Sequence, residues 1–467
     1  MLSLEEVFHP RSIAIIGVST SEDSWVNKTF LRAILDFGFP GPIYPINPRN
    51  GELRGIQVYP SLKDVPGPVD FALCAVPVAL AKQCLLESIE KGVKVLAFYT
   101  AGFSEKDEDG SLREKEFVKL ARSSGTRILG PNCMGLYYPA ERISYSPFFP
   151  RESGDVSYLS QSGGNSAELV EMVAFRGVRF SKVVSYGNAI DINETELLEY
   201  YGRDDETRIV LSYIEGIQGR NFFSTLRKVS SQKAVIIAKG GQTAIGAQAT
   251  QSHTGSIAGD YKLWPVLCRQ AGAIVVENIQ EMADLLVAFY YLPPLPRANI
   301  GIIGIGGGAS VQAADACEKA GLTVPPYPEK IQRSLREFIP QAGTSVKNPL
   351  DSAVSVIWHA PTMLKTLQVV ALCPDVDLLL LQPPVQLGLY HLGEEALQEA
   401  IQAVVQAKKE IAKPIVVVLR HSASPQTSAI FFNLQQKLVE AGMPVYPDLH
   451  RAAWALGKFH QYWRSKD

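Results

Sequence analysis

The stretch VDFALCAVPVALAKQCLLESIEKGVKVLAFYT, residues 69–100, decides the fold of this chain because it contains a complete strand–helix–strand pattern. Its two ends, VDFALCAVP (69–77) and VKVLAFYT (93–100), are apolar runs of strand length that stop at small or turn residues. The middle, ALAKQCLLESIEKG (79–92), has apolar residues at helical spacing and a closing glycine. Strands joined through a helix usually lie parallel in one sheet, so the stretch predicts a parallel sheet covered by helices.

The same alternation continues in both directions from this stretch. SIAIIG (12–17) precedes it, a second set of strands begins at DVSYLS (155–160), and a third begins at IGIIGIGGGASVQAADACEKAGL (300–322). LPPLPRAN (292–299) carries three prolines in eight residues and predicts a linker. We therefore expect an α/β protein of three doubly wound domains, at residues 1–140, 141–295 and 299–467.

Composition and charge exclude several classes of function. The chain has 467 residues, of which 46% are hydrophobic and 20% charged, and its formal net charge is −2. This balance gives no electrostatic case for nucleic acid or an anionic membrane. The six cysteines form no C-x-x-C pair and the seven histidines have no ligand spacing, so reduced thiols and no bound metal are expected. Without a signal-peptide pattern or a run of about 18 apolar residues, we expect a soluble, cytoplasmic protein.

The first domain has a turn that is typical of a site for a phosphate-containing ligand. IAIIGVSTSEDSWVNKTF (13–30) runs from a strand through a glycine and small hydroxyl residues into a helix, which directs backbone N–H groups at a phosphate. AVP (75–77) and TAGF (100–103) end later strands at the same carboxyl edge, where ligands of open α/β sheets bind. The absence of G-x-G-x-x-G and of an acidic residue at the ribose spacing argues against NAD. The alternative to a nucleotide-containing ligand is an ordinary strand-to-helix turn.

In the second domain, SQSGGNSAELVEMV (160–173) is a strand end that runs directly into a helix. Ser162, Gly163 and Gly164 leave the first N–H groups of that helix accessible, and the helix dipole favours an anion there. Ordinary N-capping by Ser160 or Ser162 explains the serines equally well. The segment lacks the G-x-S-x-G elbow of serine hydrolases.

Two further residues follow neighbouring strands of the second domain. Glu215 closes RIVLSYIEG (208–216), and His253 lies in ATQSHTGSIAGD (249–260), whose small residues predict a pliable loop. A lone loop histidine is commonly exposed and idle, and an acidic residue before a glycine is commonly a turn cap. The alternative is a nucleophilic imidazole that Glu215 orients and that attacks a phosphoryl group held at Ser162–Gly164.

Together these motifs resemble the NDP-forming acyl-CoA synthetases, most closely the α-part of ADP-forming acetyl-CoA synthetase, with succinyl-CoA synthetase more distant. The resemblance covers nearly the whole chain in order, and its most specific motifs are GPNCMG (130–135) and SHTGSIAG (252–259). It implies an N-terminal Rossmann-like CoA-binding domain followed by two flavodoxin-like ligase domains. The other matching motifs are IIGVS, YPINP (44–48), AVP, TAGF, SQSGG, SYGNAIDINETELLEYY (185–201), YIEG (213–216), GGGASVQAADACEKAGL and NPLD (348–351).

The resemblance implies roles for individual residues. His253 matches the family's phosphohistidine and Glu215 the glutamate that holds it. Ser162, Gly163 and Gly164 match the helix start that binds the phosphoryl group. The residues that this resemblance associates with CoA are Gly17, Ser19, Thr20, Lys28, Asn47, Pro77, Ala101, Gly102 and Asn132, with Cys133 beside the last of them.

Two short segments depart from the family pattern. WVNKTF (25–30) stands where the family commonly has glycine near the start of the first helix, and Lys28 would there offer a point charge to a CoA phosphate. SQSGGN has Gly164 and Asn165 where other residues are usual.

The resemblance also implies a partner, because three α/β domains account for this chain and none reads as an ATP-grasp portion. A separate ATP-grasp β-subunit, in an αβ or α2β2 assembly, would bind ADP or ATP with Mg²⁺. The implied reaction interconverts acyl-CoA, phosphate and ADP with a carboxylic acid, CoA and ATP through an acyl phosphate. Two alternatives are a non-catalytic CoA-binding regulatory or scaffold protein and a citrate-activating ligase on the same architecture.

Overall fold

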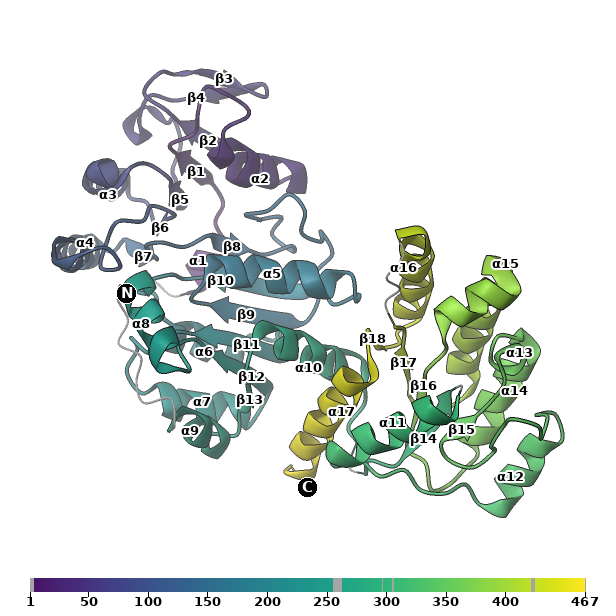
Figure 1. Ribbon diagram of the computed structural model, residues 1–467. Helices are drawn as coiled ribbons and strands as arrows, with labels where there is room; N and C mark the ends of the chain where they lie inside the picture. Colours follow the sequence, from purple (N-terminus) through teal and green to yellow (C-terminus); the bar gives the residue numbers. More distant parts are fainter. Residues whose placement is uncertain (1–3, 255–262, 296, 305, 421–424, 467) are drawn as a thin grey trace. The chain divides into compact units, whose positions relative to one another are not determined.

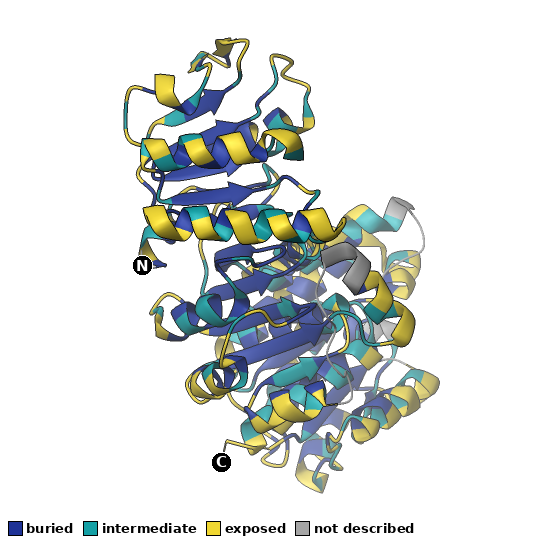
Figure 2. Ribbon diagram, turned by 90° about the vertical axis from the view of Figure 1, so that its left-hand side faces the viewer, coloured by how far each residue is buried: buried dark blue, intermediate teal, exposed yellow. Residues whose placement is uncertain are grey.

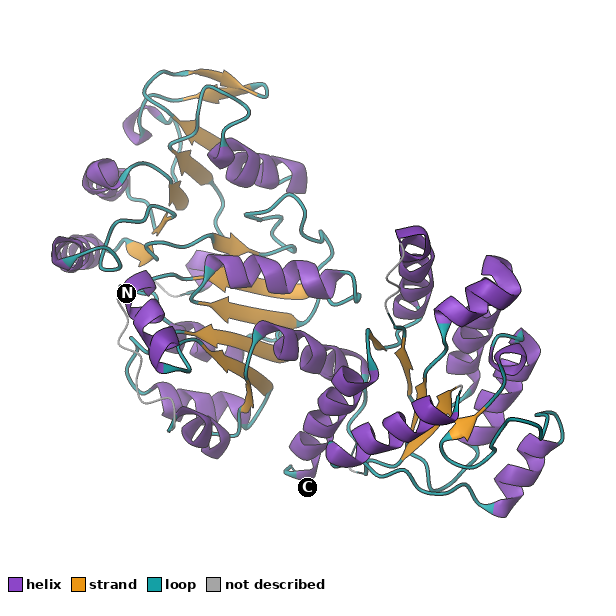
Figure 3. Cartoon of the chain, viewed as in Figure 1, coloured by secondary structure: helices purple, strands orange, loops and turns teal. Residues whose placement is uncertain are grey.

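The computed structural model describes residues 4–254, 263–295, 297–304, 306–420 and 425–466. The chain packs into two compact units. One comprises Met1–Ala174 with Arg179–Met282, and the other Phe175–Val178 with Ala283–Asp467. Both units consist of strands alternating with helices, as the sequence predicts (Figures 1 and 3).

The first sheet has the strand order β2-β1-β5-β6-β7, and all its neighbouring strands are parallel. Residues 69–100 form β5, the helix α3 and β6, in agreement with the prediction. Gly92 ends α3 in a left-handed conformation with φ 75°. The elements of this part are α1 (Glu5–Phe8), β1 (Ile13–Ile16), η1 (Asn27–Leu31), α2 (Arg32–Phe37), β2 (Ile43–Ile46), β3 (Gly51–Leu53), β4 (Ile56–Val58), η2 (Leu62–Asp64), β5 (Phe71–Cys74), α3 (Val78–Lys91), β6 (Val95–Phe98), α4 (Glu108–Ser124) and β7 (Arg127–Leu129).

The strands β1, β5 and β6 of the first sheet are apolar along their whole length because both of their faces are covered. Every residue of β1, β5 and β6 is buried. The helices α3 and α4 bury one stripe each and leave their outer faces exposed (Figure 2). Continuous apolar strands of this kind are typical of parallel sheets.

The second sheet has the order β13-β12-β11-β9-β10-β8. Its strands are parallel except β8, which pairs antiparallel with β10 through Tyr137 and Val183. The strand β8 thus precedes residue 140 in the chain but belongs to this sheet. The elements are β8 (Gly135–Tyr137), β9 (Val156–Ser160), α5 (Gly163–Ala174), β10 (Phe180–Ser185), α6 (Glu194–Arg203), β11 (Ile209–Ile214), α7 (Phe222–Ser230), β12 (Ala234–Lys239), α8 (Ala244–Thr254), α9 (Trp264–Gln270) and β13 (Ile274–Val276).

The segment that carries His253 differs from the sequence expectation. A pliable loop is predicted there, whereas Ala244–Thr254 forms α8 and places the backbone of His253 in its last turn. Thr243 directly precedes the helix, and its Oγ1 accepts the Gly246 N–H at 3.0 Å and caps the first turn. Its alanines favour the helix, which the loop prediction did not take into account. The rest of the motif, residues 255–262, lies outside the described residues.

The second unit contains one parallel sheet of order β15-β14-β16-β17-β18. The helix α10 contains the point at which the two units divide. None of the described helices has the length and apolar content that crossing a bilayer requires. The elements are α10 (Ile279–Tyr291), β14 (Ile300–Gly304), α11 (Gly307–Lys319), α12 (Glu329–Arg336), β15 (Leu350–Asp351), α13 (Val354–Ile357), α14 (Ala360–Ala371), β16 (Leu378–Leu381), α15 (Val385–Glu410), β17 (Ile415–Val418), α16 (Pro425–Glu440), β18 (Val445–Tyr446) and α17 (Leu449–Arg464).

A buried ion cluster explains why residues 175–178 pack with the second unit. The Arg176 guanidinium donates to Asp284 at 2.7 Å and lies 4.9 Å from the ring centroid of Tyr446. Arg451 donates to both carboxylate oxygens of Asp284, at 2.6 and 2.8 Å. Two cations thus neutralise one buried carboxylate, as burial of a charge requires.

Candidate functional site

Three adjacent strands of the second sheet carry the predicted catalytic residues at one edge. The strands β9, β11 and β12 are parallel neighbours, so their carboxyl ends lie side by side. Ser162–Gly164 follow β9, Glu215 follows β11, and α8 with the backbone of His253 follows β12. The side chain of His253 lies outside the described residues, so its pairing with Glu215 stays a prediction.

The start of α5 shows the N-cap that the sequence predicts, and anion binding there stays a prediction. Ser162 Oγ accepts the Asn165 N–H at 3.3 Å, which is an N-cap hydrogen bond. Capping leaves the N–H groups of Gly163 and Gly164 in the first turn, where a helix offers them no acceptor. Gly163 has a packing reason as well, because a Cβ there would lie 2.7 Å from Met134 Cγ. The helix start is therefore both capped and chemically suited to an anion.

Gln161 and Lys239 are two residues of this edge that the sequence analysis missed. Gln161 Oε1 accepts the N–H groups of Glu215 at 2.7 Å and of Gly216 at 3.0 Å. Lys239 Nζ donates to the backbone carbonyls of Glu215 at 2.6 Å and of Gly240 at 2.7 Å. The available signals were an amide side chain directly after β9 and a lysine at the end of the apolar run of β12.

The surroundings of Glu215 are buried and rich in ionisable groups. Glu215 and Lys239 are each only 4% exposed. Burial lowers the pKa of Lys239, while the Glu215 charge acts in the opposite direction. Burial also raises the pKa of the Tyr213 hydroxyl, and the Glu215 charge adds to that rise. A carboxylate in such a low-dielectric setting interacts strongly with any neighbouring imidazole.

The predicted CoA-binding residues follow four adjacent strands of the first sheet. Asn47 follows β2, Gly17 follows β1, Pro77 lies between β5 and α3, and Ala101 lies beyond β6. Gly17 has φ 98°, and a Cβ there would lie 2.8 Å from the Ala75 carbonyl oxygen. Glycine is therefore required where the chain turns from β1 towards the neighbouring strand end.

The polar groups of several of these residues are engaged within the protein. Asn47 Nδ2 donates to the Val18 carbonyl at 2.5 Å, and Asn47 Oδ1 accepts the Arg49 N–H at 2.8 Å. The Gly102 N–H donates to Glu105 Oε1 at 2.5 Å. These bonds fix the shape of the turns. Thr20 is exposed, and Lys28 Nζ pairs with Asp23 at 2.9 Å.

The residues Asn132 and Cys133 lie where the first sheet meets the second. Asn132 donates its N–H to the Thr100 carbonyl at 3.1 Å, and the Asn188 N–H donates to the Pro131 carbonyl at 2.9 Å. Gly187 has no room for a side chain, since a Cβ would lie 2.0 Å from that same carbonyl oxygen. Burial raises the pKa of the Cys133 thiol to about 12, so it is a packed thiol at neutral pH.

Asn188 links this junction to two carboxylates of the first domain. Its Nδ2 donates to Glu105 Oε2 at 2.7 Å and to Glu114 Oε1 at 2.9 Å. Burial raises the pKa of Glu114, and the Glu105 charge adds to the rise. The junction between the two sheets therefore contains partly buried carboxyl groups as well as close backbone packing.

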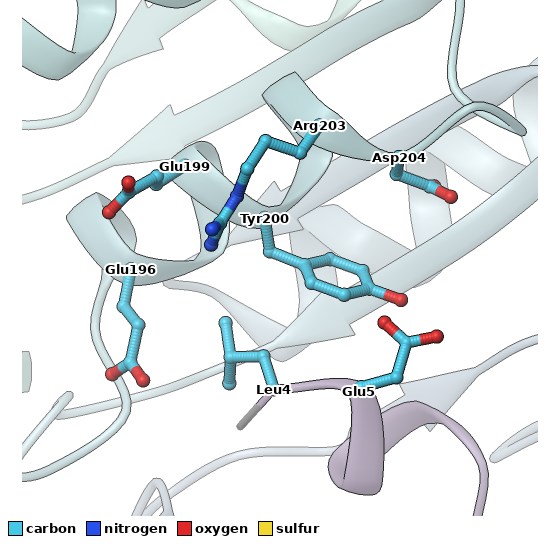
Figure 4. Close-up of a pocket in the computed structure, with 7 residues that line it drawn as sticks. All are labelled: Leu4, Glu5, Glu196, Glu199, Tyr200, Arg203 and Asp204. Carbon is cyan, nitrogen blue, oxygen red and sulfur yellow. The ribbon is translucent and has the colours of Figure 1, made fainter. Parts of the chain in front are cut away.

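A cavity of about 460 Å³ lies between α1 and α6, away from these strand ends. It is lined by Leu4, Glu5, Glu196, Glu199, Tyr200, Arg203 and Asp204 (Figure 4). The Glu5 side chain points towards the Tyr200 hydroxyl, and Glu196 makes two hydrogen bonds with Arg127 at 2.8 and 2.9 Å. None of the residues that line this cavity is a predicted site residue, so the cavity is separate from the predicted site. No group of three metal-ligating side chains occurs among the described residues.

Comparisons with known proteins agree with this arrangement. A CoA binding domain model matches residues 11–139, and a succinyl-CoA ligase like flavodoxin domain model matches residues 153–289. The acetate–CoA ligase [ADP-forming] II subunit alpha of Pyrococcus furiosus is 34% identical over 460 residues, which cover 97% of each chain.

Two further relatives extend the comparison. The acetate–CoA ligase [ADP-forming] of Methanocaldococcus jannaschii is 36% identical over 74% of this chain, which covers 49% of that relative. The dinucleotide forming acetyl-coenzyme A synthetase 1 of Ca. Korarchaeum cryptofilum, solved in complex with phosphate and ADP, has a TM-score of 0.81 at 29% identity, over 100% of this chain and 99% of that chain. Because the Pyrococcus furiosus relative is 34% identical over 97% of this chain, the chain belongs to the NDP-forming acyl-CoA synthetase family.

Proposed function

We propose that this chain is the α-subunit of an ADP-forming acyl-CoA synthetase. The reaction interconverts acyl-CoA, phosphate and ADP with a carboxylic acid, CoA and ATP. The observation that supports it most is the near-full-length similarity to the Pyrococcus furiosus α-subunit. Residues 1–140 would bind CoA, residues 141–295 would carry the phosphohistidine, and residues 299–467 would form the third domain.

In the proposed mechanism a phosphate oxygen attacks the thioester carbonyl carbon. The C–S bond breaks, CoA leaves as the thiol, and an acyl phosphate remains. His253 then attacks the phosphorus atom, the bond to the acyl oxygen breaks, and the carboxylic acid leaves as its carboxylate. The N–H groups at Ser162–Gly164 bind the phosphoryl oxygens, and Glu215 orients the imidazole.

The last proposed step transfers the phosphoryl group from His253 to ADP with Mg²⁺ on a separate ATP-grasp β-subunit. The relative from Methanocaldococcus jannaschii supports a partner, since this chain spans about half of its length and its name carries no subunit designation. We propose an αβ or α2β2 assembly. The second half of the active site would then come from the other chain.

The half-reaction that needs no ADP tests this function. The purified chain should convert acetyl phosphate and CoA to acetyl-CoA and phosphate, because acyl transfer from the phosphate to the CoA thiol uses only the residues proposed here. A CoA-binding scaffold would bind CoA but show no turnover. A citrate-activating ligase would turn over citrate when the partner is added. Turnover with citrate but not with acetate, propionate or aromatic acids would favour the citrate-activating alternative.

A further inference from the structure

An exposed aromatic stack lies at the CoA edge of the first sheet. The Trp25 ring stacks on Tyr99, with ring centroids 4.8 Å apart and an interplanar angle of 22°. Phe30, which is buried, meets both rings edge-on at 5.6 and 5.3 Å. Trp25 itself is 50% exposed. Two neighbouring rings thus hold the indole, and a large part of its surface faces solvent.

The stack lies close to the point where ligands of open α/β sheets bind. The chain passes from β1 to β2 on one side and returns to β5 on the other side of β1, so the strand order reverses between β1 and β5. Trp25 lies in the connection that follows β1. Tyr99 directly follows β6 and donates its N–H to the Cys74 carbonyl at the end of β5, at 3.0 Å. A crevice at such a reversal is the usual ligand site of this fold class.

The turn that presents Trp25 is built around a buried asparagine. Asn27 is 5% exposed, its Oδ1 accepts the Ser19 N–H at 3.0 Å, and its Nδ2 donates to the carbonyls of Ser19 at 2.7 Å and Ser21 at 2.9 Å. Asn27 also begins the π-helical turn η1, a rare conformation that is frequent at functional sites. The polar groups of the turn are therefore directed inward, and its exposed aromatic surface is the indole.

A cation lies one turn along the chain from the indole. Lys28 Nζ is 2.9 Å from Asp23 Oδ1, and the two side chains are 54% and 89% exposed. An ion pair this exposed is weak, so Lys28 can exchange the carboxylate for a phosphate of a ligand. A planar aromatic surface beside a cation suits a ligand with a base and a phosphate.

We propose that Trp25 is the stacking surface for the adenine ring of CoA and that Lys28 contacts a phosphate of the same molecule. This inference rests on the proposed function, which makes CoA a substrate. It assigns recognition of the nucleotide end of CoA to the segment WVNKTF (25–30), in which this sequence departs from the family pattern. The pantetheine end would then extend towards the junction with the second sheet.

The test is titration of the full chain with CoA and with pantetheine, which lacks the adenine nucleotide, by calorimetry and tryptophan fluorescence. CoA should quench the fluorescence of the wild-type chain, because Trp25 is the exposed tryptophan of the described residues. Trp25→Ala should abolish the quenching and raise the Kd for CoA by about 5- to 150-fold, the range for loss of one base–aromatic stack. Trp25→Phe should retain most of the wild-type affinity for CoA.

Matched measurements separate a failure of the stacking role from a failure of the proposed function. Neither Trp25→Ala nor Lys28→Met should change the Kd for pantetheine, and Tyr390→Ala, which removes an aromatic residue that is 85% exposed in α15, should change neither Kd. If Trp25→Ala binds CoA as tightly as the wild type, the stacking role is wrong and the proposed function stands. If the wild-type chain fails to bind CoA, the proposed function fails and the stacking role fails with it.

Discussion

Gln161 holds the backbone of Glu215, because its side-chain carbonyl oxygen accepts the Glu215 N–H at 2.7 Å. The same oxygen accepts the Gly216 N–H at 3.0 Å, and Gln161 is only 2% exposed. Gln161 directly precedes Ser162 in the chain. One side chain therefore ties the proposed phosphoryl-binding helix start to the residue proposed to orient His253.

Replacing Gln161 by methionine should impair both stability and phosphoryl transfer. Methionine fills a similar volume but leaves two buried N–H groups without their acceptor, at a cost of about 1–3 kcal/mol each. Urea unfolding should show the loss of stability, and the rate of ATP-dependent labelling with the partner should fall. Gln83→Met, at an exposed position of α3, is the control and should change neither. An unchanged labelling rate in Gln161→Met would rule out a positioning role.

The turn after β1 gives a prediction about sterics at the CoA edge. Gly17 and Gly38 both have positive φ, 98° and 73°, but only at Gly17 would a Cβ meet another atom, the Ala75 carbonyl oxygen at 2.8 Å. Gly38→Ala should cost about 1–2 kcal/mol, the penalty of the left-handed conformation. Gly17→Ala should cost more and weaken CoA binding, measured by urea unfolding and calorimetry. Equal losses of stability would contradict the close approach of β1 and β5.

A buried ion pair joins the first sheet to the second. Arg127, in β7, donates to Asp191 at 2.7 Å, and both side chains are at most 6% exposed. Arg127→Met leaves the Asp191 carboxylate buried without this partner and should lower the free energy of unfolding by about 3–5 kcal/mol.

The exposed pair of Arg208 and Asp155 provides the matched control. Their side chains are 50% and 41% exposed, so Arg208→Met should cost about 0–1 kcal/mol. Thermal unfolding and limited proteolysis of both variants test the difference. Similar behaviour of the two variants would mean that the Arg127 pair does not hold the two sheets together.

Glu114 gives a pH-dependent prediction at the same junction. Burial raises the pKa of this carboxyl group above its ordinary 4.5, so folding favours the protonated form. The stability contributed by the proton is complete below the unfolded pKa and is lost as the pH rises from the unfolded value through the folded value. Glu114→Gln keeps an acceptor oxygen for Asn188 and removes the charge.

Glu114→Gln should therefore unfold at a higher urea concentration than the wild type at pH 8, and the difference should shrink towards pH 4. Asn188 and Ser104 donate to Glu114 Oε1, which the amide oxygen of glutamine replaces. A gain in stability that is the same at both pH values would show that the titration of Glu114 does not contribute.

Local sequence patterns predicted the sheets because their information lies within short segments. Residues 69–100 contain the apolar runs, the helical spacing and the glycine stop that produce β5, α3 and β6. The antiparallel pairing of β8 with β10 joins residues far apart in the chain, and three residues of strand give too little pattern to predict it. The loop predicted at His253 was wrong because the small residues of this segment include alanines, which favour a helix, and because Thr243 caps its first turn.

The candidate site was predictable to the extent that its residues match motifs. Glu215 and Ser162–Gly164 stand in such motifs, and the parallel order of β9 and β11 brings them to one edge. Gln161 and Lys239 act through backbone groups of another strand end, and no local pattern encodes those contacts. Trp25 was noted only as a departure, since its stacking on Tyr99 depends on the folded sheet.

The central claim is phosphoryl transfer through His253, and ATP-dependent labelling tests it most directly. The chain is incubated with its ATP-grasp partner and [γ-³²P]ATP, and the acid-labile label on this chain is counted. The account predicts that the wild type and His391→Ala, which removes an exposed histidine of α15, take up label. It predicts that His253→Ala takes up none. Label that persists on this chain in His253→Ala would contradict the account.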